Sequence, residues 1–199
     1  SRLRALGVRR LYAVQGPVHV DYRGHELATE ALANELVARA NAGPGTVLVV
    51  SHSSGSHVAA ELFYRLFHTR SDRGGALRGR VLFVSLDGDP EVPSDPTRRL
   101  SAETVGGLRH AWFVTARDPA RGLDALSNGA MRAQQRRYAA QSDFVEYDAR
   151  DAGCTSRLCV HLSVVNARPS ARGNDSYARF ATGAPNTFWL DRALPRWER

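Results

Sequence analysis

The stretch Val47–Leu62, VLVVSHSSGSHVAAEL, joins an apolar run directly to a pattern of helical periodicity. Thr46–Ser51 is β-branched and apolar almost throughout, as expected for a strand that is buried on both faces. From near Ser54 onward the apolar residues recur at helical spacing, namely Val58, Ala59, Leu62, Phe63, Leu66 and Phe67. A buried strand that runs straight into an amphipathic helix is the building unit of parallel sheets. The stretch therefore predicts an α/β fold.

The alternation of strand and helix patterns continues on both sides of this stretch. Further strands are predicted at Arg10–Gln15, Arg80–Leu86, Ala111–Thr115 and Asp143–Tyr147. Helices are predicted around Leu126–Gln141, near Thr187–Ala193, and from about Gly24 to Asn41 with Leu27, Ala31, Leu32, Leu36 and Ala40 on one face. The chain from Asp148 onward is otherwise expected to be irregular. We therefore expect a mostly parallel five-stranded sheet flanked by helices, with right-handed crossovers.

Length and composition agree with a single domain. The 199 residues, 43% of them hydrophobic, suffice for one core without a metal or several disulfides, so we expect one domain over residues 1–199. The net charge of +7 reflects 27 Arg against 20 Asp and Glu, with no Lys. The Arg residues are scattered along the chain and form no basic stripe, so nucleic-acid binding is not expected. No apolar run approaches the ~20 residues that cross a bilayer, so no membrane span is expected.

Ser53 stands at the turn between the predicted strand and helix, where a nucleophile would project above the sheet. A turn this tight needs small residues two positions before and two after the nucleophile, and these positions hold Ser51 and Gly55. The Ser54 amide, at the helix N-terminus, would stabilise developing negative charge. The alternative is a turn that only caps the helix or holds a phosphate. Gly-Lys-Ser/Thr and Gly-x-Gly-x-x-Gly are both absent from the sequence, which excludes a P-loop and a dinucleotide-binding loop.

Val49–Leu62, VVSHSSGSHVAAEL, resembles the nucleophile elbow of the esterases and lipases of the α/β-hydrolase superfamily. Ser51 takes the place of the first Gly of the usual motif. The resemblance extends over nearly the whole chain and implies an α/β-hydrolase-like, minimal five-stranded core of about the size of a cutinase. It also implies a serine hydrolase whose catalytic triad follows the order Ser, acid, His.

His161 is the predicted base because, of the seven His residues, it is the one that follows the last predicted strand. Its surroundings, CVHL at residues 159–162, resemble the Cys-x-His-Leu segment around the base of lipases related to the pancreatic enzyme. The alternative is a loop His with no part in catalysis. His52, inside the elbow, is expected to support the turn rather than to transfer protons.

Two Asp residues stand at strand ends and compete for the role of the acid. Asp118 follows the fourth predicted strand, the position that most members of the superfamily use, and TARD at residues 115–118 resembles their Gly-x-x-Asp pattern. Asp87 follows the third strand, and LDGDP at residues 86–90 resembles the Leu-Asp-Pro of pancreatic-type lipases. Asp87 and Asp89 can otherwise be read as turn formers. We favour Asp118 and keep Asp87 as the alternative.

These residues together predict hydrolysis of carboxylic esters through an acyl-enzyme on Ser53, with His161 as base. The oxyanion donors would be the amide of Ser54 and that of Gln15 or Gly16, at the end of the first strand. No cofactor and no metal are expected. The chain has no long apolar insertion that could form a lid, which favours a small-molecule or polymeric ester substrate, and we expect a monomer. The alternative is a non-catalytic α/β-hydrolase-fold binding protein, which should lack a member of the triad.

Cys154 and Cys159 are five residues apart and directly precede His161. Too few further Cys or His residues surround them for a zinc site. We expect a disulfide that closes this short loop, stabilises the fold by ~2 kcal/mol and holds the segment that carries His161. A disulfide would imply an oxidising compartment, hence a secreted or periplasmic protein. The alternative is a reduced pair in a cytosolic enzyme.

Overall fold

The structure, a computed structural model, describes residues 10, 12, 23–68, 72–88, 100–125, 142–165 and 188 of the chain. Three predicted elements lie wholly or mostly outside the described residues, namely the strand Arg10–Gln15 and the helices Leu126–Gln141 and Thr187–Ala193. Gln15 and Gly16, the expected oxyanion residues, lie outside them as well.

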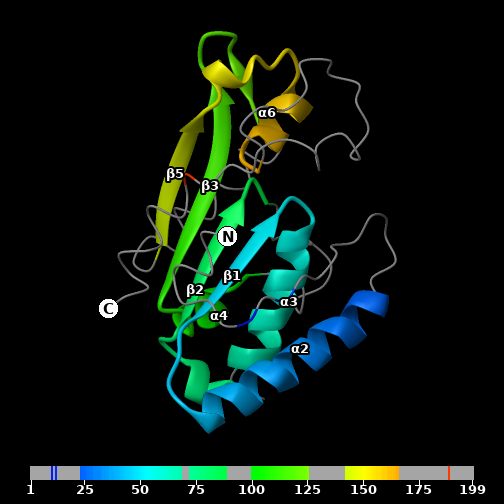
Figure 1. Cartoon of the computed structure of the whole chain (residues 1–199), viewed down its shortest axis with the longest axis vertical. Coiled ribbons are helices and arrows are strands. Elements are labelled where there is room, and N and C mark those ends of the chain that lie inside the picture. Colours follow the sequence, from blue (N-terminus) through cyan, green and yellow to red (C-terminus); the bar gives the residue numbers. More distant parts are fainter. Residues whose placement is uncertain are drawn as a thin grey trace.

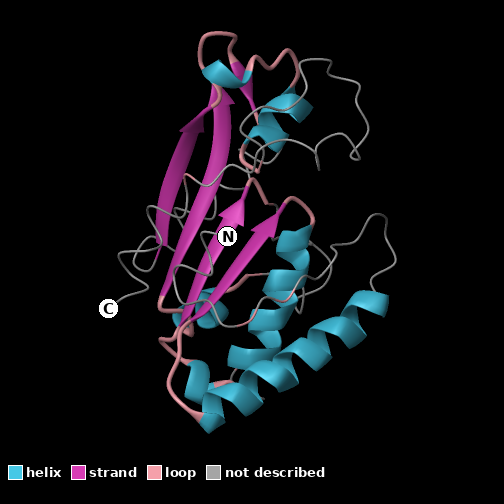
Figure 2. Cartoon of the chain, viewed as in Figure 1, coloured by secondary structure: helices cyan, strands magenta, loops and turns pink. Residues whose placement is uncertain are grey.

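A mostly parallel, five-stranded sheet forms the centre of the described fold (Figure 1). Its strands are β1 (Val47–His52), β2 (Val81–Leu86), β3 (His110–Asp118), β4 (Leu123–Asp124) and β5 (Ser142–Asp148). β1 pairs with β2, β2 with β3 and β3 with β5 in parallel, whereas β4 runs antiparallel to β3. Helices flank this sheet (Figure 2), so the predicted α/β class is confirmed.

Four of the predicted strands correspond to β1, β2, β3 and β5, but the far end of β3 differs from the prediction. β3 continues for three residues beyond Thr115, as far as Asp118. Arg117 pairs there with Asp124 of β4 on one side and with Asp148 of β5 on the other. Since β5 occupies the second side, β4 lies on the side of β2, beyond the point where β2 ends. The sequence does not predict β4 because two residues carry no periodicity.

The described helices are α2 (Arg23–Ala42), α3 (Gly55–Phe67), α4 (Ala102–Gly106) and α6 (Arg157–Ser163), with 3-10 turns η1 (Gly75–Leu77) and η4 (Arg150–Ala152). α2 and α3 occur where the periodicity predicts helices. The expectation of an irregular chain after Asp148 is wrong for η4 and α6. Ser156 caps α6 by accepting a hydrogen bond from the Cys159 amide at 3.2 Å. Of the described helices, none combines the length and apolar composition that crossing a bilayer requires.

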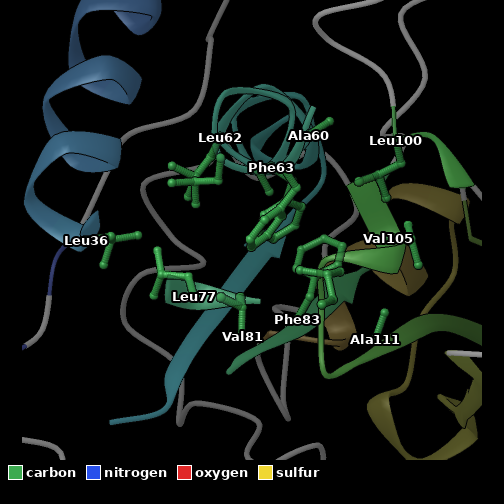
Figure 3. Close-up of a cluster of buried hydrophobic side chains, with 14 of the residues drawn as sticks. Leu36, Ala60, Leu62, Phe63, Leu77, Val81, Phe83, Leu100, Val105 and Ala111 are labelled. Carbon is green, nitrogen blue, oxygen red and sulfur yellow. The ribbon is translucent and has the colours of Figure 1, made fainter. Parts of the chain in front are cut away.

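One face of the sheet packs against α2 and α3 and forms the larger of two cores (Figure 3). Phe83 of β2 lies at its centre, with its ring centroid 4.9 Å from that of Phe63 and 6.2 Å from that of Phe113, edge-on to both. Around them lie buried residues of both helices, among them Leu36, Ala60, Leu62, Leu66 and Phe67. This core anchors α3, and therefore the turn from which α3 begins.

The buried stripe of α2 differs from the predicted one. Thr29, Ala33, Leu36 and Ala40 are buried, whereas Leu27 is 77% exposed and Ala31 is exposed as well. Small side chains dominate the buried stripe because α2 packs against α3, and small residues allow the two helices to approach closely. The prediction from hydrophobicity is therefore confirmed for Leu36 and Ala40 and wrong for Leu27 and Ala31.

The opposite face of the sheet forms a second core beneath α6. Leu82, Val84 and Leu86 of β2 point to this face, alternating with Val81 and Phe83 on the first. They pack with Trp112 and Val114 of β3, with Cys154, and with Cys159, Val160 and Val164 of the α6 segment. Because both faces are covered, β2 is buried along its whole length, as its continuous apolar run predicts.

Candidate active site

Ser53 forms the turn between β1 and α3. Its φ is +52°, in the left-handed region, which costs a non-glycine residue roughly 1–2 kcal/mol. The Ser53 amide donates to the carbonyl oxygen of Leu86 at 3.2 Å, and the Ser53 carbonyl oxygen accepts from the Ser56 amide at 3.0 Å. Backbone strain of this kind is concentrated at functional sites, where the surrounding structure holds it in place. Ser53 therefore occupies a tight, strained turn at the carboxyl edge of the sheet.

Ser54 and Gly55 lead from the Ser53 turn into α3. Ser54 is the N-cap residue of α3, so its amide lies at the positive end of that helix. A Cβ at Gly55 would lie 4.0 Å from the Cβ of Ser51, which is ordinary van der Waals contact. Alanine would therefore fit at position 55 without displacing Ser51.

His161 and Asp87 form a buried pair at the same edge of the sheet. His161 lies on α6, and its Nδ1 is hydrogen-bonded to Oδ2 of Asp87. The His161 residue is 3% exposed and Asp87 is fully buried. The backbone of Asp87 has a φ of +42°, and its amide donates to the carbonyl oxygen of Val114 at 2.6 Å. The structure thus joins the predicted base to the alternative acid of the sequence analysis.

Thr115 holds the second oxygen of the Asp87 carboxylate, a contact that the sequence analysis missed. The Thr115 hydroxyl donates to Oδ1 of Asp87 at 2.9 Å, and both side chains are fully buried. The available signal was a hydroxyl that interrupts the apolar run of β3 one residue after Val114. With one oxygen bound by Thr115 and the other by His161, the carboxylate has a defined orientation.

Asp118, the favoured acid, contacts a different partner. Its carboxylate accepts hydrogen bonds from the Arg121 amide at 3.1 Å and from Nη1 of Arg121 at 2.8 Å. The Arg121 hydrogen bond holds the pKa of the Asp118 carboxyl below its ordinary value of 3.8. Asp118 therefore stabilises the turn that leads into β4, and the carboxylate that contacts His161 is that of Asp87.

Strand register explains why Asp87, rather than Asp118, reaches His161. His52 is aligned with Leu86, and Leu86 with Val114, so Ser53, Asp87 and Thr115 are the next residues at one level of the sheet. Asp118 lies three residues farther along β3, about 10 Å at the rise of an extended strand. The extension of β3 past the end of β2 thus carries Asp118 away from the level of Ser53.

His52 lies against His161. Its Nε2 is 3.4 Å from the main-chain oxygen of His161, and the two imidazole centroids are 4.7 Å apart with their planes tilted by 34°. Burial, reinforced by the nearby His161, lowers the pKa of His52 from 6.5 to about 4. His52 is therefore neutral near pH 7. The sequence favours a role for His52 in supporting the turn, and in the structure its described side-chain contacts are with His161 of α6.

Cys154 and Cys159 lie at disulfide distance, with their Cα atoms 5.3 Å apart. Both are buried, and Cys159 lies on α6 two residues before His161. The pair links the first turn of α6 to the segment that precedes it. Within the described part of the chain, no group of three or more His, Cys, Asp or Glu side chains is arranged to hold a metal ion.

Comparisons of this chain with models of protein families, with curated proteins and with solved structures found no match.

Proposed function

We propose that this protein is a serine hydrolase that cleaves carboxylic esters through an acyl-enzyme on Ser53. The observation that carries the proposal is the buried Asp87–His161 pair, at the same level of the sheet as a serine on a strained strand-to-helix turn. A nucleophile, a base and a group that orients the base are the parts that this chemistry requires. Asp87, not Asp118, is the acid in this proposal.

The proposed reaction uses each of these groups once per half-reaction. Nδ1 of His161 is hydrogen-bonded to Asp87, which leaves Nε2 of His161 to act as the base. Nε2 takes the proton of the Ser53 hydroxyl as Oγ of Ser53 attacks the ester carbonyl. The resulting imidazolium is stabilised by the carboxylate and then protonates the leaving alcohol. Water, deprotonated by the same Nε2, then attacks the acyl-enzyme, and the imidazolium returns this proton to Oγ of Ser53 as the carboxylic acid product leaves.

The oxyanion that forms on the carbonyl oxygen needs hydrogen-bond donors. In the proposal one is the Ser54 amide, at the N-terminus of α3, and the second is the amide of Gln15 or Gly16. Loss of one such donor typically lowers kcat by roughly 100- to 1000-fold.

The proposed class is an α/β-hydrolase of the esterase or lipase kind that acts on small or polymeric esters. Support comes from the parallel sheet, from the turn after β1 and from an acid placed after β2, where residues 86–90 resemble the Leu-Asp-Pro segment of pancreatic-type lipases. Secretion or export to the periplasm is proposed as well, since the buried Cys pair at disulfide distance fits an oxidising compartment.

A fluorophosphonate label combined with a p-nitrophenyl ester assay tests this function. The wild-type protein should be labelled on Ser53 and turn over the ester, and Ser53→Ala should lose both activities. Ser101→Ala, which removes the N-cap of α4 at the end of the sheet opposite to the end of β1 (Figure 1), is the matched control and should keep both. Label or turnover that survives in Ser53→Ala would refute the proposal. A folded wild-type protein with neither would support the alternative, a non-catalytic binding protein.

A further inference from the structure

Three buried serines lie directly beneath the proposed catalytic residues. Ser51 is in β1, Ser56 in the first turn of α3, and Ser85 in β2. The Ser56 hydroxyl oxygen is 3.1 Å from that of Ser51 and 3.3 Å from that of Ser85. Ser51 stands two residues before Ser53, and Ser85 two residues before Asp87. One hydroxyl therefore links the strand that ends in the nucleophile to the strand that ends in the acid.

Core packing does not account for these hydroxyls. Ser56 and Ser85 are fully buried, and Ser51 is 7% exposed. A buried hydroxyl loses its hydration, which destabilises the fold unless hydrogen bonds compensate. Alanine would fill nearly the same volume without that cost. The serines gain directed contacts instead, in two strands whose preceding residues are all apolar.

Ser56 also contacts the backbone that follows Asp87. A Cβ added at Gly88 would lie 1.7 Å from Oγ of Ser56 and 2.6 Å from Oγ of Ser85. Only glycine lets the chain pass this close to the Ser56 side chain. In addition, the Ser56 amide donates to the carbonyl oxygen of Ser53 at 3.0 Å. Ser56 thus touches both the turn that presents Ser53 and the turn that presents Asp87.

We propose that Ser56 is a positioning residue, which holds the Ser53 turn and the Asp87 turn at a fixed separation. The inference rests on the proposed function, because it assigns Ser53 and Asp87 their reactive parts. In a triad the serine and the acid act through one histidine, so any shift of one turn relative to the other misaligns the proton transfer. Displacements near 1 Å can reduce rates by roughly 100-fold.

Ser56→Ala tests this role because it keeps the Cβ and removes the hydroxyl. We expect kcat to fall roughly 10- to 100-fold with KM within about twofold of wild type, since substrate contacts are unchanged. Ser101→Ala is the control: it loses an N-cap bond and hence stability in urea, but its kcat should match wild type. A purely structural role for Ser56 would make the two variants behave alike.

Gly88→Ala provides an independent test through the close contact. Its Cβ would collide with Ser56, push the Asp87 turn away and lower kcat. Ser56→Gly and Ser85→Ala together remove the three nearest atoms that this Cβ would meet, so Gly88→Ala added to that double variant should cause no further loss of kcat. A further loss in the triple variant would show that the Asp87 turn is not held through the Ser56 contact.

The outcomes separate this inference from the proposed function. Turnover that persists in Ser53→Ala would refute the serine hydrolase itself. Turnover that depends on Ser53, together with a kcat in Ser56→Ala within twofold of wild type, would overturn the positioning role alone. If Ser56→Ala does not fold, Ser85→Ala replaces it, because it removes the partner hydroxyl of Ser56 on β2. The positioning role then predicts the same fall in kcat at constant KM for Ser85→Ala, and an unchanged kcat would overturn it.

Discussion

Two residues of the proposed triad have backbone angles that their residue types seldom adopt. Ser53 and Asp87 both have positive φ, of +52° and +42°. Each stands one residue beyond a parallel strand, and main-chain hydrogen bonds hold both turns, from the Ser53 amide to Leu86 and from the Asp87 amide to Val114. The neighbouring strand therefore holds each strained turn in place.

Substitution of the two candidate acids should separate them. Asp87→Asn should lower kcat roughly 10,000-fold, because an amide can donate to Nδ1 of His161 and so select the wrong tautomer. Asp118→Asn keeps an acceptor for Arg121 and should retain a kcat close to that of wild type. Ester hydrolysis by both variants, after circular dichroism has shown that they fold, measures the difference. The reverse ranking would return the acid role to Asp118.

His52 should make the protein less stable in mild acid. In the unfolded chain it takes up a proton near pH 6.5, but in the folded protein only near pH 4. Between these values the unfolded state binds more protons than the folded state. The contribution of neutral His52 to stability is therefore fully present above pH 6.5 and is lost as the pH falls toward 4. From pH 7 to pH 5, wild type should lose about 1–2 kcal/mol relative to His52→Gln, as measured by urea unfolding. Equal losses in the two proteins would contradict the buried, neutral state of His52.

At the scale of elements, Arg80 ties the end of α2 to the sheet. Its guanidinium donates to four main-chain oxygens, namely those of Ala40, Gly43, Gly45 and Ala76. Ala40 lies in the last turn of α2, and Gly43 and Gly45 in the connection to β1. One planar side chain therefore satisfies carbonyl groups that the end of the helix leaves without intrahelical partners.

Arg80→Lys should destabilise the fold by about 1–2 kcal/mol, because an ammonium group cannot reproduce the fork of guanidinium bonds. Chemical denaturation measures this change. Arg78→Lys is the matched control, since Arg78 donates to an exposed Asp72 carboxylate and to a single carbonyl oxygen, that of Phe67. A smaller loss for Arg80→Lys than for Arg78→Lys would contradict the assigned role.

At the scale of the whole molecule, the sheet is covered on both faces, and β2 lies at the centre of both cores. Phe83→Ala removes the ring that contacts Phe63 and Phe113 edge-on and should lower the free energy of unfolding by about 3–5 kcal/mol. Leu27→Ala, at a position 77% exposed, should change it by less than about 0.5 kcal/mol. Urea unfolding of both variants tests the assignment, and similar losses would contradict it.

The sequence was sufficient for elements whose pattern is local and long. β1, β2 and α3 carry several periodic residues each, so their boundaries agree with the prediction to within one residue at most ends. α4, β4 and α6 have seven residues or fewer and lie outside the reach of periodicity. The predicted burial of Leu27 was wrong for another reason. Which side of α2 is buried depends on the elements that cover the helix, not on the helix sequence alone.

The sequence by itself determined the α/β class and pointed to Ser53 and His161, because a strand-turn-helix segment and its small residues are local features. The tertiary structure alone decided which carboxylate meets His161, since that depends on how far β3 extends past β2. It likewise brought Thr115 to Asp87, His52 to His161 and Ser56 to Gly88. Such contacts join segments distant in sequence, and their partners are set by strand register and by the packing of α3 and α6.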